Sequence, residues 1–473
     1  MSDLMPKEWI LGKASDFVVS PKNDIVDGPF GSNLKASEYQ LSGTPIIRLQ
    51  NIKRLHFINK NIKYVSNEKA VELSRHSYKK GDIVITKLGD PLGLACIIPE
   101  NFQDGIIVAD LVRLRINDLA FDKRYLTYLL NSPLVISQLN KHIKGTTRPR
   151  INLGIIRDLN LPIASISEQK IIAEKLDTLL AQVDSTKARL KQIPQILKRF
   201  RQAVLTIAIN GKLTEIFRVQ NKLKDNWVEM PLERLACSDK YSLGIGPFGS
   251  NLKVEDYREE GHPLIFVRDI RACSFSNSET RYIDSSKFEE LKAHRAKPGD
   301  LLITKMGDPP GDAAIYPSDC EEAVITADCI KLRVANELAL SKFILFTIMS
   351  NEFREKVIEI SAGVAQQKVN LKNFKKLQLN IPPLPEQAEI VRRVEQLFTY
   401  ADTIEKQVNN ALTRVNNLTQ SILAKAFRGE LTAQWRAENP ELINGENSAA
   451  ALLEKIKAER ATSSGKKAAR KKA

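Results

Sequence analysis

The sequence predicts an α+β protein with two tandem-duplicated α/β modules, separated by two long antiparallel coiled-coil helices and related by pseudo-twofold symmetry. Three observations lead to this prediction. The eight-residue phrase GPFGSNLK occurs twice, further phrases recur at the same distance along the chain, and two long stretches place apolar residues at coiled-coil spacing. Because the halves repeat, each element expected in one module is expected again in the other.

The repeat keeps a nearly constant register. The two GPFGSNLK copies start at Gly28 and Gly246, which are 218 positions apart. The later phrases GDIVITKLGDP and GDLLITKMGDP keep this distance. We expect one small compensated slip in the register, within residues 159–168. Further pairs at the same distance are Trp9 and Trp227, Asp110 and Asp328, and Gly211 and Gly429.

Residues 1–165 and 216–383 are the two predicted modules. Short segments such as DIVIT, LACIIP and LVRLRI are rich in β-branched residues and lie between Gly, Pro, Asn and Asp, as strands between turns do. A longer segment, KRYLTYLLNSPLVISQL, interrupts them and predicts helix. Each module therefore mixes strands with helices.

Residues 166–215 and 384–434 are the two predicted coiled-coil helices. Their apolar residues alternate steps of four and three, a spacing that pairs long helices along one seam. Two amphipathic helices, each packed on its own module, are the alternative. We expect Pro194 to kink or split the first helix. The seam includes Ile172, Leu176, Leu179, Val183, Ile390, Val394, Leu397 and Ile404.

Helices paired about a pseudo-twofold axis make the predicted architecture nearly circular. We expect both termini to lie close to the point where the central helix meets the second module. Residues 435–473 form a basic C-terminal tail that ends in GKKAARKKA.

The composition of the 473 residues favours a nucleic-acid partner. The net charge is +15, only part of which lies in the tail, and such an excess favours a polyanion. There is no apolar run of about 18 residues and no N-terminal signal pattern, so we expect a cytoplasmic protein without a membrane segment. The five cysteines and five histidines are scattered, which favours reduced thiols and argues against a zinc site.

Motifs for catalysis are missing or incomplete. GIGPFG at Gly244 fits the G-x-G-x-x-G pattern of dinucleotide loops, but the first copy has Val26 at the matching position and no helix pattern follows either copy. GDLLITK faintly resembles a nuclease motif, yet Ile303 stands where an acid is required. Asp90 and Asp308 lie between Gly and Pro, as turn residues do. P-loop, NPPY methyltransferase and serine-hydrolase motifs are absent, so we expect no enzyme activity.

Four groups of phrases carry a resemblance that covers nearly the whole chain. They are the two GPFGSNLK copies, the GDIVITK and GDLLITK pair, PIASISEQKIIAEKLDTLLAQVD, and IPPLPEQAEIVRRVEQLF. In these phrases the chain resembles the specificity subunit of type I restriction–modification systems, and its helices resemble the enterobacterial branch. The resemblance implies that each module is a target recognition domain that reads half of a bipartite site in double-stranded DNA. Because the modules share long phrases, we expect related, inverted half-sites.

The resemblance also implies the partners. Two modification subunits, which hold S-adenosylmethionine, bind along the two helices, and two restriction subunits, which use ATP and magnesium, join later. The seam residues named above are the candidate contacts, and this chain itself carries no cofactor and no catalytic residue. Two alternatives remain open: a stand-alone bipartite DNA-binding repressor, and a coiled-coil scaffold that bridges proteins.

The doubled loop supplies the first candidates for DNA contact. Asn suits base edges, Lys suits phosphate, and Gly lets a backbone approach DNA closely, whereas a plain turn at a strand end is the alternative. Lys87 and Lys305, each between a strand and a turn, are candidate phosphate contacts or solvated lysines. The loop candidates are Gly28, Gly31, Ser32, Asn33 and Lys35, with Gly246, Gly249, Ser250, Asn251 and Lys253.

A second loop differs between the modules. GTTRPRINL in the first module aligns with GVAQQKVNL in the second. Because Arg prefers guanine and Gln prefers adenine in the major groove, this loop is where related readers would select different bases. A surface loop that is free to drift is the alternative. The candidates are Arg148 and Arg150, opposite Gln366, Gln367 and Lys368.

Overall fold

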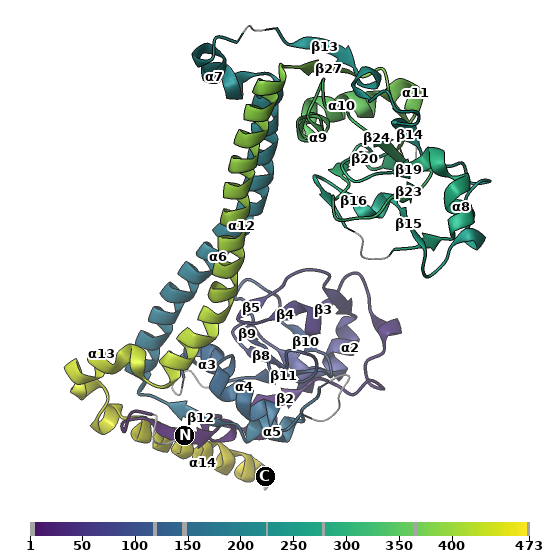
Figure 1. The fold of residues 1–473 in the computed structure, drawn as a ribbon. Coiled ribbons are helices and arrows are strands. Elements are labelled where there is room, and N and C mark those ends of the chain that lie inside the picture. Colours follow the sequence, from purple (N-terminus) through teal and green to yellow (C-terminus); the bar gives the residue numbers. More distant parts are fainter. Residues whose placement is uncertain are drawn as a thin grey trace. The chain divides into compact units, whose positions relative to one another are not determined.

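The computed structural model describes residues 5–116, 121–143, 149–223, 226–276, 280–363 and 367–470, with side chains up to residue 462. The chain divides into two compact units (Figure 1). One unit comprises Met1–Leu190 and Ala411–Ala473, and the other comprises Lys191–Asn410. Each unit holds one module and part of both long helices, so the first unit combines two separate segments of the sequence, whereas the second is one continuous segment.

The first module contains an antiparallel four-stranded sheet in the order β2 (Ile25–Asp27), β11 (Leu111–Leu114), β8 (Ile83–Thr86) and β9 (Ala95–Ile97). Every residue of β8 and β11 is buried. Successive side chains of a strand point to opposite faces. Accordingly, Ile83 and Ile85 belong to one hydrophobic cluster and Val84 belongs to another. The sheet is therefore covered on both sides.

A second four-stranded sheet has the order β6 (Lys63–Val65), β3 (Thr44–Ile47), β10 (Gly105–Ile107) and β7 (Ser77–Tyr78). Its central pair, β3 and β10, is parallel, and the outer pairs are antiparallel. Because β10 leads into β11 through a short turn, residues 108–110 join the two sheets.

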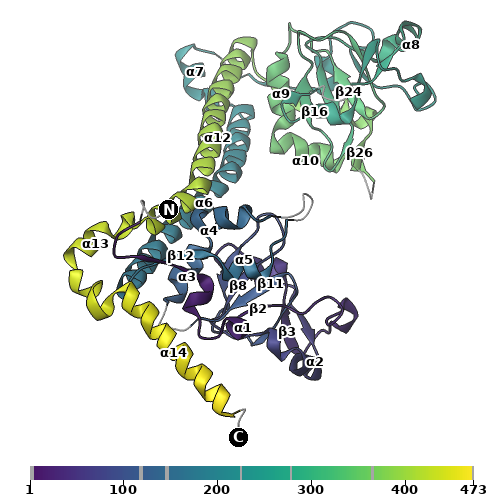
Figure 2. The same ribbon diagram turned by 90° about the horizontal axis from the view of Figure 1, so that it is seen from below.

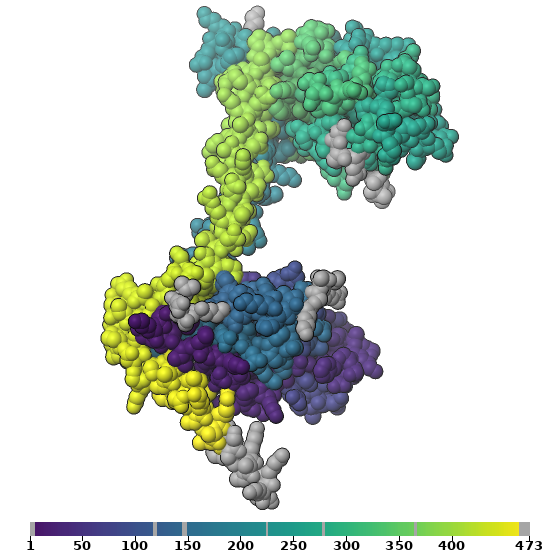
Figure 3. Space-filling model, turned by 60° about the horizontal axis from the view of Figure 1, so that its bottom comes forward, coloured from purple at the N-terminus to yellow at the C-terminus, as the bar shows by residue number. Residues whose placement is uncertain are grey.

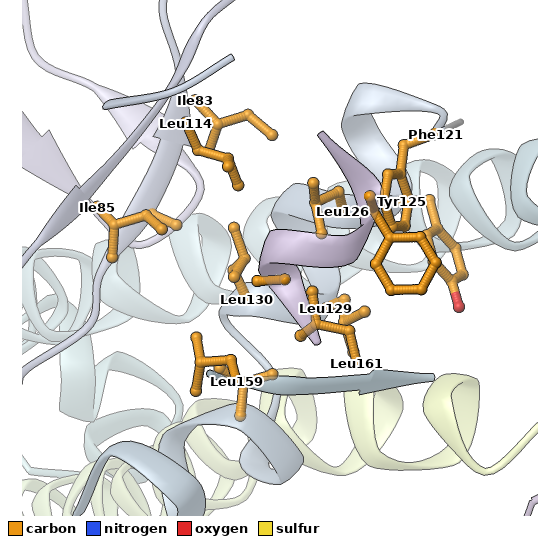
Figure 4. Close-up of a cluster of buried hydrophobic side chains, with 14 of the residues drawn as sticks. Ile83, Ile85, Leu114, Phe121, Tyr125, Leu126, Leu129, Leu130, Leu159 and Leu161 are labelled. Carbon is orange, nitrogen blue, oxygen red and sulfur yellow. The ribbon is translucent and has the colours of Figure 1, made fainter. Parts of the chain in front are cut away.

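Two helices cover one face of the first sheet, α3 (Lys123–Leu130) and α4 (Pro133–Asn140). Asp122 caps α3 by accepting hydrogen bonds from the backbone N–H groups of residues 124 and 125, at 2.9 and 3.1 Å. The buried side of α3 faces the strands, with Leu126 and Leu130 turned toward Ile83 and Leu114 (Figure 4). A further short helix, α5 (Leu153–Arg157), contacts β2 in the same module (Figure 2).

The second module repeats these elements at the same distance of residue numbers. Its strands β13 (Val228–Pro231) and β27 (Gln378–Ile381) pair as β1 (Ile10–Lys13) and β12 (Asn160–Ile163) do, without any shift. The predicted slip within residues 159–168 is therefore wrong, since β12 and β27 match residue for residue. The sheets are β14 (Leu243–Ile245), β24 (Cys329–Leu332), β20 (Leu301–Thr304) and β22 (Ala313–Ile315), and β18 (Tyr282–Ile283), β15 (His262–Ile265), β23 (Ala323–Ile325) and β19 (Arg295–Ala296).

The two long helices are α6 (Ile166–Ile209) and α12 (Leu384–Phe427), each of 44 residues. The start of α6 shares a hydrophobic cluster with the end of α12 in the first unit. The end of α6 shares another with the start of α12 in the second unit. The helices therefore pack antiparallel, as predicted. Shared residues include Ile172, Leu176, Leu423 and Phe427 in the first cluster, and Val204, Leu205, Ile390 and Val394 in the second.

Pro194 does not split α6, which is helical on both sides of it. The Pro194 side chain is exposed, and both Val183 before it and Leu197 after it are buried. Because packing on both sides holds the helix, the local loss of one backbone hydrogen bond does not end it. The seam also departs from the predicted pattern at Leu179, which is less buried than Leu180.

A buried carboxylate ties each module to the helices. In the first unit, Glu168 accepts hydrogen bonds from Trp9 Nε1 at 2.8 Å, Thr432 Oγ1 at 2.6 Å and Arg436 Nη1 at 2.5 Å. Trp9 comes from the start of the chain, whereas Thr432 and Arg436 come from beyond the end of α12. In the second unit, Glu386 binds Trp227, Thr214 and Arg218 in the same way, at 3.1, 2.7 and 2.5 Å.

Glu168 therefore joins segments near both ends of the chain within the first unit. The expectation that the termini lie where the central helix meets the second module is wrong. The reason is that Thr432 and Arg436 serve the first module as Thr214 and Arg218 serve the second. The C-terminal residues are thus structural partners of the first module.

The segment after α12 is folded against the first module. It contains α13 (Ala433–Glu438) and α14 (Ala449–Arg470), and Ile456 of α14 lies in the module's hydrophobic core. Arg460 donates hydrogen bonds to the carbonyls of Ser15 and Val18, both at 2.6 Å. In Figure 3 the N-terminal segment, in purple, lies along this C-terminal helix, in yellow. Within the described ranges, no helix is long and apolar enough to cross a membrane.

Candidate DNA interface

The doubled loop of the first module is fixed at both ends. Gly28 N donates to Leu111 O at 3.1 Å, and a Cβ at residue 28 would lie 2.1 Å from the Val108 backbone. Leu34 is buried at the other end. Between them, Asn33 N donates to the carbonyl of residue 30 at 2.8 Å, which closes a turn. The loop is therefore a fixed projection.

The second module builds the same loop. Gly246 N donates to Cys329 O at 3.2 Å, and a Cβ at residue 246 would lie 2.1 Å from the Thr326 backbone. Asn251 N donates to the carbonyl of residue 248 at 2.8 Å, and Leu252 is buried. The protein's own backbone thus requires glycine at positions 28 and 246, and the prediction that these two glycines admit DNA gains no support from their surroundings.

The other two loop glycines have open surroundings. Apart from its own chain neighbours, neither Gly31 nor Gly249 has an atom within 4 Å of an added Cβ. The polar candidates beside them are exposed: Ser32 Oγ donates to Asn33 Oδ1 at 3.4 Å, and the second copy repeats this bond at 3.2 Å. Lys35 and Lys253 are exposed and form no ion pair within the described part of the chain. These residues therefore present donors, acceptors and positive charge to solvent.

The structure brings three predicted segments of the first module together at the turn of residues 108–111. Gly28 bonds to this turn as described, Lys87 N donates to Asp110 O at 2.9 Å, and Arg150 Nη2 donates to Asp110 Oδ1 at 3.1 Å. The second loop also pairs with the lysine segment, because the backbone N–H of residue 151 donates to Lys87 O at 3.1 Å. Arg148 lies outside the described residues.

The second module gathers the matching segments at residues 326–329. Lys305 N donates to Asp328 O at 2.7 Å, and Lys368 Nζ lies 3.4 Å from Asp328 Oδ1. Here the second loop forms a strand, β26 (Gln367–Val369), which pairs with β21 (Met306–Gly307). Gln367 is only partly exposed, and Gln366 lies outside the described residues. The candidate interface of each module therefore consists of three adjoining segments.

Lys87 and Lys305 differ, although they hold equivalent positions. Lys87 Nζ lies 2.7 Å from Asp27 Oδ2, and its side chain is only 11% exposed. The second module has Ile245 at the position of Asp27, and among the described residues Lys305 Nζ has a single long contact, of 3.5 Å with Ala327 O. The positive charge of Lys87 is therefore offset inside its own module, so a phosphate contact stays a prediction with structural support only at Lys305.

The seam residues named as partner contacts are largely internal. Ile172, Leu176, Ile390 and Val394 are fully buried in the chain's own clusters. A subunit that binds along α6 or α12 cannot reach these four side chains without opening the cores. Exposed residues of the same helices are therefore better candidates. Of the remaining four, Val183 is also buried, whereas Leu179, Leu397 and Ile404 are partly exposed.

Sequence reasoning missed several residues of this site. Asp27 was overlooked because it has no counterpart in the second module, so the repeat pattern hides it. In the sequence Asp110 is notable only as the counterpart of Asp328. In the structure its backbone carbonyl binds the lysine segment and its side chain binds the second loop. Phe30 and Phe248 lie inside the doubled phrase itself, and their exposure in the structure singles them out.

A model of the family "Type I restriction modification DNA specificity domain" matches residues 14–195 and 271–414. The EcoKI specificity subunit of Escherichia coli (strain K12) is 40% identical to this chain over 478 residues, which is 99% of each protein. The StySPI specificity subunit of Salmonella potsdam is 46% identical over 353 residues, which is 74% of each. The predicted resemblance to the enterobacterial branch is therefore confirmed.

Two solved structures share the fold at 16% sequence identity. The HsdS subunit from Thermoanaerobacter tengcongensis has a TM-score of 0.55, with coverage of 90% of this chain and 98% of that chain. A chain from a structural study of assembly and conformational transition in the type I R-M system has a TM-score of 0.59, with 90% and 99% coverage. Together, the family model, the relatives matched over the whole length and the fold show that this chain belongs to the type I restriction–modification specificity subunits, the non-catalytic DNA-recognition components of those systems.

Proposed function

We propose that each module reads one half of a bipartite site in double-stranded DNA, and that this chain thereby directs the methylation or cleavage carried out by its partner subunits. The observation that carries the proposal is the doubled cluster of three segments, which gathers exposed Asn, Ser and Lys side chains in each module. Asn is suited to paired hydrogen bonds with adenine, and Lys to phosphate. The net charge of +15 supports a polyanionic ligand.

The shared loops and the differing loops take different parts in this proposal. Ser32, Asn33 and Lys35 recur as Ser250, Asn251 and Lys253, so they supply the contacts common to both half-sites. Because these contacts are common, the half-sites are related and inverted. Arg150 and Lys368 occupy matching places but differ in chemistry, so this second loop selects the bases that distinguish the half-sites.

The chain assembles with two modification subunits and two restriction subunits in the cytoplasm. S-adenosylmethionine is held by the modification subunits, and ATP and magnesium by the restriction subunits. The long helices are the proposed docking surface, through exposed apolar side chains instead of the buried seam. Tyr400 of α12 is 63% exposed and Ile196 of α6 is 57% exposed, so both side chains are accessible to a partner.

Sequencing methylated adenines in a host that expresses this chain with its modification subunit tests the proposal. We expect a single two-part sequence with a fixed gap, methylated on both strands, which disappears when the chain is deleted. Specific binding of the chain to duplex DNA without methylation by any partner would favour a repressor. No affinity for any duplex, alone or with partners, would favour a protein scaffold.

A further inference from the structure

We infer that Phe30 and Phe248 are DNA-contacting residues whose rings pack against bases at an opened base step, one in each half-site. The inference rests on the proposed function, because it assigns a further contact to the same two modules. Neither the repeat pattern nor the charge of the chain requires an aromatic contact, so it can fail while the proposed function holds.

Both rings are exposed to solvent. Phe30 is 77% exposed and Phe248 is 70% exposed, whereas most phenylalanines of the chain lie in its cores. Neither ring pairs with another aromatic ring or with a cation in the described ranges. One exposed apolar residue needs no explanation. The same residue, exposed in the same way in both modules, indicates a shared use.

The loop fixes the backbone that carries each ring. In the first module, Gly28 and Pro29 before the ring and Leu34 after it are buried. The carbonyl of Phe30 accepts the hydrogen bond from Asn33 N at 2.8 Å. The second module repeats this arrangement around Phe248. Because the loop backbone is already fixed, placing the ring against a ligand requires little loss of backbone conformational freedom.

The residues beside each ring fit duplex DNA. Gly31 has open space where a side chain would stand, so the backbone next to the ring can approach a groove. Asn33 offers polar groups for base edges, and Lys35 adds a positive charge for phosphate. Within the eight residues of the loop no apolar patch continues from the ring, since Gly, Ser and Asn follow it and the leucine after them is buried. A docking surface for a protein would need such a patch.

A single exposed ring beside polar groups is suited to insertion between two neighbouring base pairs. Apolar wedges, Phe among them, enter partly unstacked base steps in proteins that deform DNA. The ring then gains contact with base faces, which every sequence offers, so it supplies affinity and DNA distortion without selecting a base. Since the contact is uncharged, it adds nothing to the salt dependence of binding.

The test uses the chain assembled with its modification subunits and a duplex that carries the methylated site. Affinity is measured by fluorescence anisotropy over a range of salt, for Phe30→Ala, Phe248→Ala and the ring-retaining Phe30→Tyr and Phe248→Tyr. We expect each Ala variant to raise Kd about 5- to 100-fold with an unchanged salt slope, and each Tyr variant to stay near the wild type. Val71→Ala, at an equally exposed position of the first module, is the matched control and should change nothing.

A second readout locates the ring on the DNA. 2-Aminopurine placed step by step through each half-site should brighten at one step in the wild-type complex, and Phe30→Ala should abolish the signal in one half-site only. Unchanged affinity and fluorescence in both Ala variants would overturn the inference. So would a loss explained by weaker assembly with the modification subunits in light scattering, because the rings would then contact protein. A wild-type complex without any preferred site would overturn the proposed function itself.

Discussion

At the scale of single residues, Lys87 and Lys305 show how one substitution changes the use of a repeated position. We expect Lys305→Ala to weaken DNA binding and to lower the salt slope by about one unit, because an unpaired cation contacts phosphate. Lys87→Ala should leave the slope unchanged but lower the melting temperature of the first unit, since Asp27 loses its partner. Salt-dependent anisotropy and thermal melting check both outcomes.

Two exchange variants control this comparison. Ile245→Asp gives Lys305 the acidic neighbour that Lys87 has, and should mimic Lys305→Ala in DNA binding. Asp27→Ile removes the acidic partner of Lys87. It should raise the salt slope of DNA binding, because the first module then has a lysine that is free to contact phosphate. If the slope followed Lys87→Ala and ignored Lys305→Ala, our assignment of the two lysines would be reversed.

Glu168 is a second residue on which a whole module depends. We expect Glu168→Ala to destabilise the first unit by about 3–5 kcal/mol, because Arg436 and Trp9 lose a buried acceptor. Glu386→Ala should do the same to the second unit. Urea unfolding checks the values, and Glu72→Ala, which breaks an exposed ion pair with Lys69, should change stability by no more than about 1 kcal/mol.

Lys331, buried in the second module, makes stability depend on pH. Burial lowers the pKa of Lys331 from its usual 10.5 to about 8, although Asp300 opposes the shift, and Arg113 holds the same place in the first module. Between these two pKa values Lys331 is largely protonated in the unfolded chain and largely neutral in the folded chain. The free energy of unfolding therefore rises with pH in this range.

Lys331→Met removes that dependence. Between pH 7 and 9.5, the wild type should gain stability relative to the variant by on the order of 2 kcal/mol, measured by urea unfolding at both pH values. Lys297→Met, at an exposed lysine of the same module, is the control and should show no such change. An equal difference between variant and wild type at the two pH values would contradict the assigned shift.

At the scale of elements, α6 shows how tertiary packing overrides a local signal. Pro194 is an exposed helix-interior proline, a poor residue for that position. We expect Pro194→Ala to raise the free energy of unfolding by up to about 3 kcal/mol without altering DNA affinity. A loss of stability in urea unfolding would indicate that the proline fits a bend that the helix needs.

The elements also show what sequence could and could not predict. The strands around Ile83 and Leu111, the antiparallel helices and the doubled loop follow from local patterns and from the repeat. The pairing of Lys87 with Asp27 does not, because it depends on which strands become neighbours. The folding of α14 onto Ser15 and Val18 was missed for a similar reason, since a basic composition hid its apolar side.

At the scale of the whole molecule, the gap between half-sites should depend on the long helices. Each residue inserted within a helix lengthens it by about 1.5 Å and rotates the downstream part of the helix by about 100°. We expect insertions after Ser167 or in the NGKLTE segment to change or abolish the preferred gap. The bases of each half-site should stay the same, because the reading residues lie in separate modules. Methylated-site sequencing of the variants checks this, and altered half-site bases with an unchanged gap would contradict it.

The cluster at Glu168 also sets the order in which the modules mature on the ribosome. The residues that bind Glu386, which are Thr214, Arg218 and Trp227, all precede it in the continuous segment of the second unit. Their hydrogen bonds can therefore form as soon as that segment leaves the ribosome. Glu168 must wait for Thr432, which is synthesised 264 positions later. At about 5–20 residues per second the delay is roughly 13–50 s. The first module is therefore synthesised first but forms its buried carboxylate contacts last. Nascent chains pass through a stage at which only the second module has these contacts.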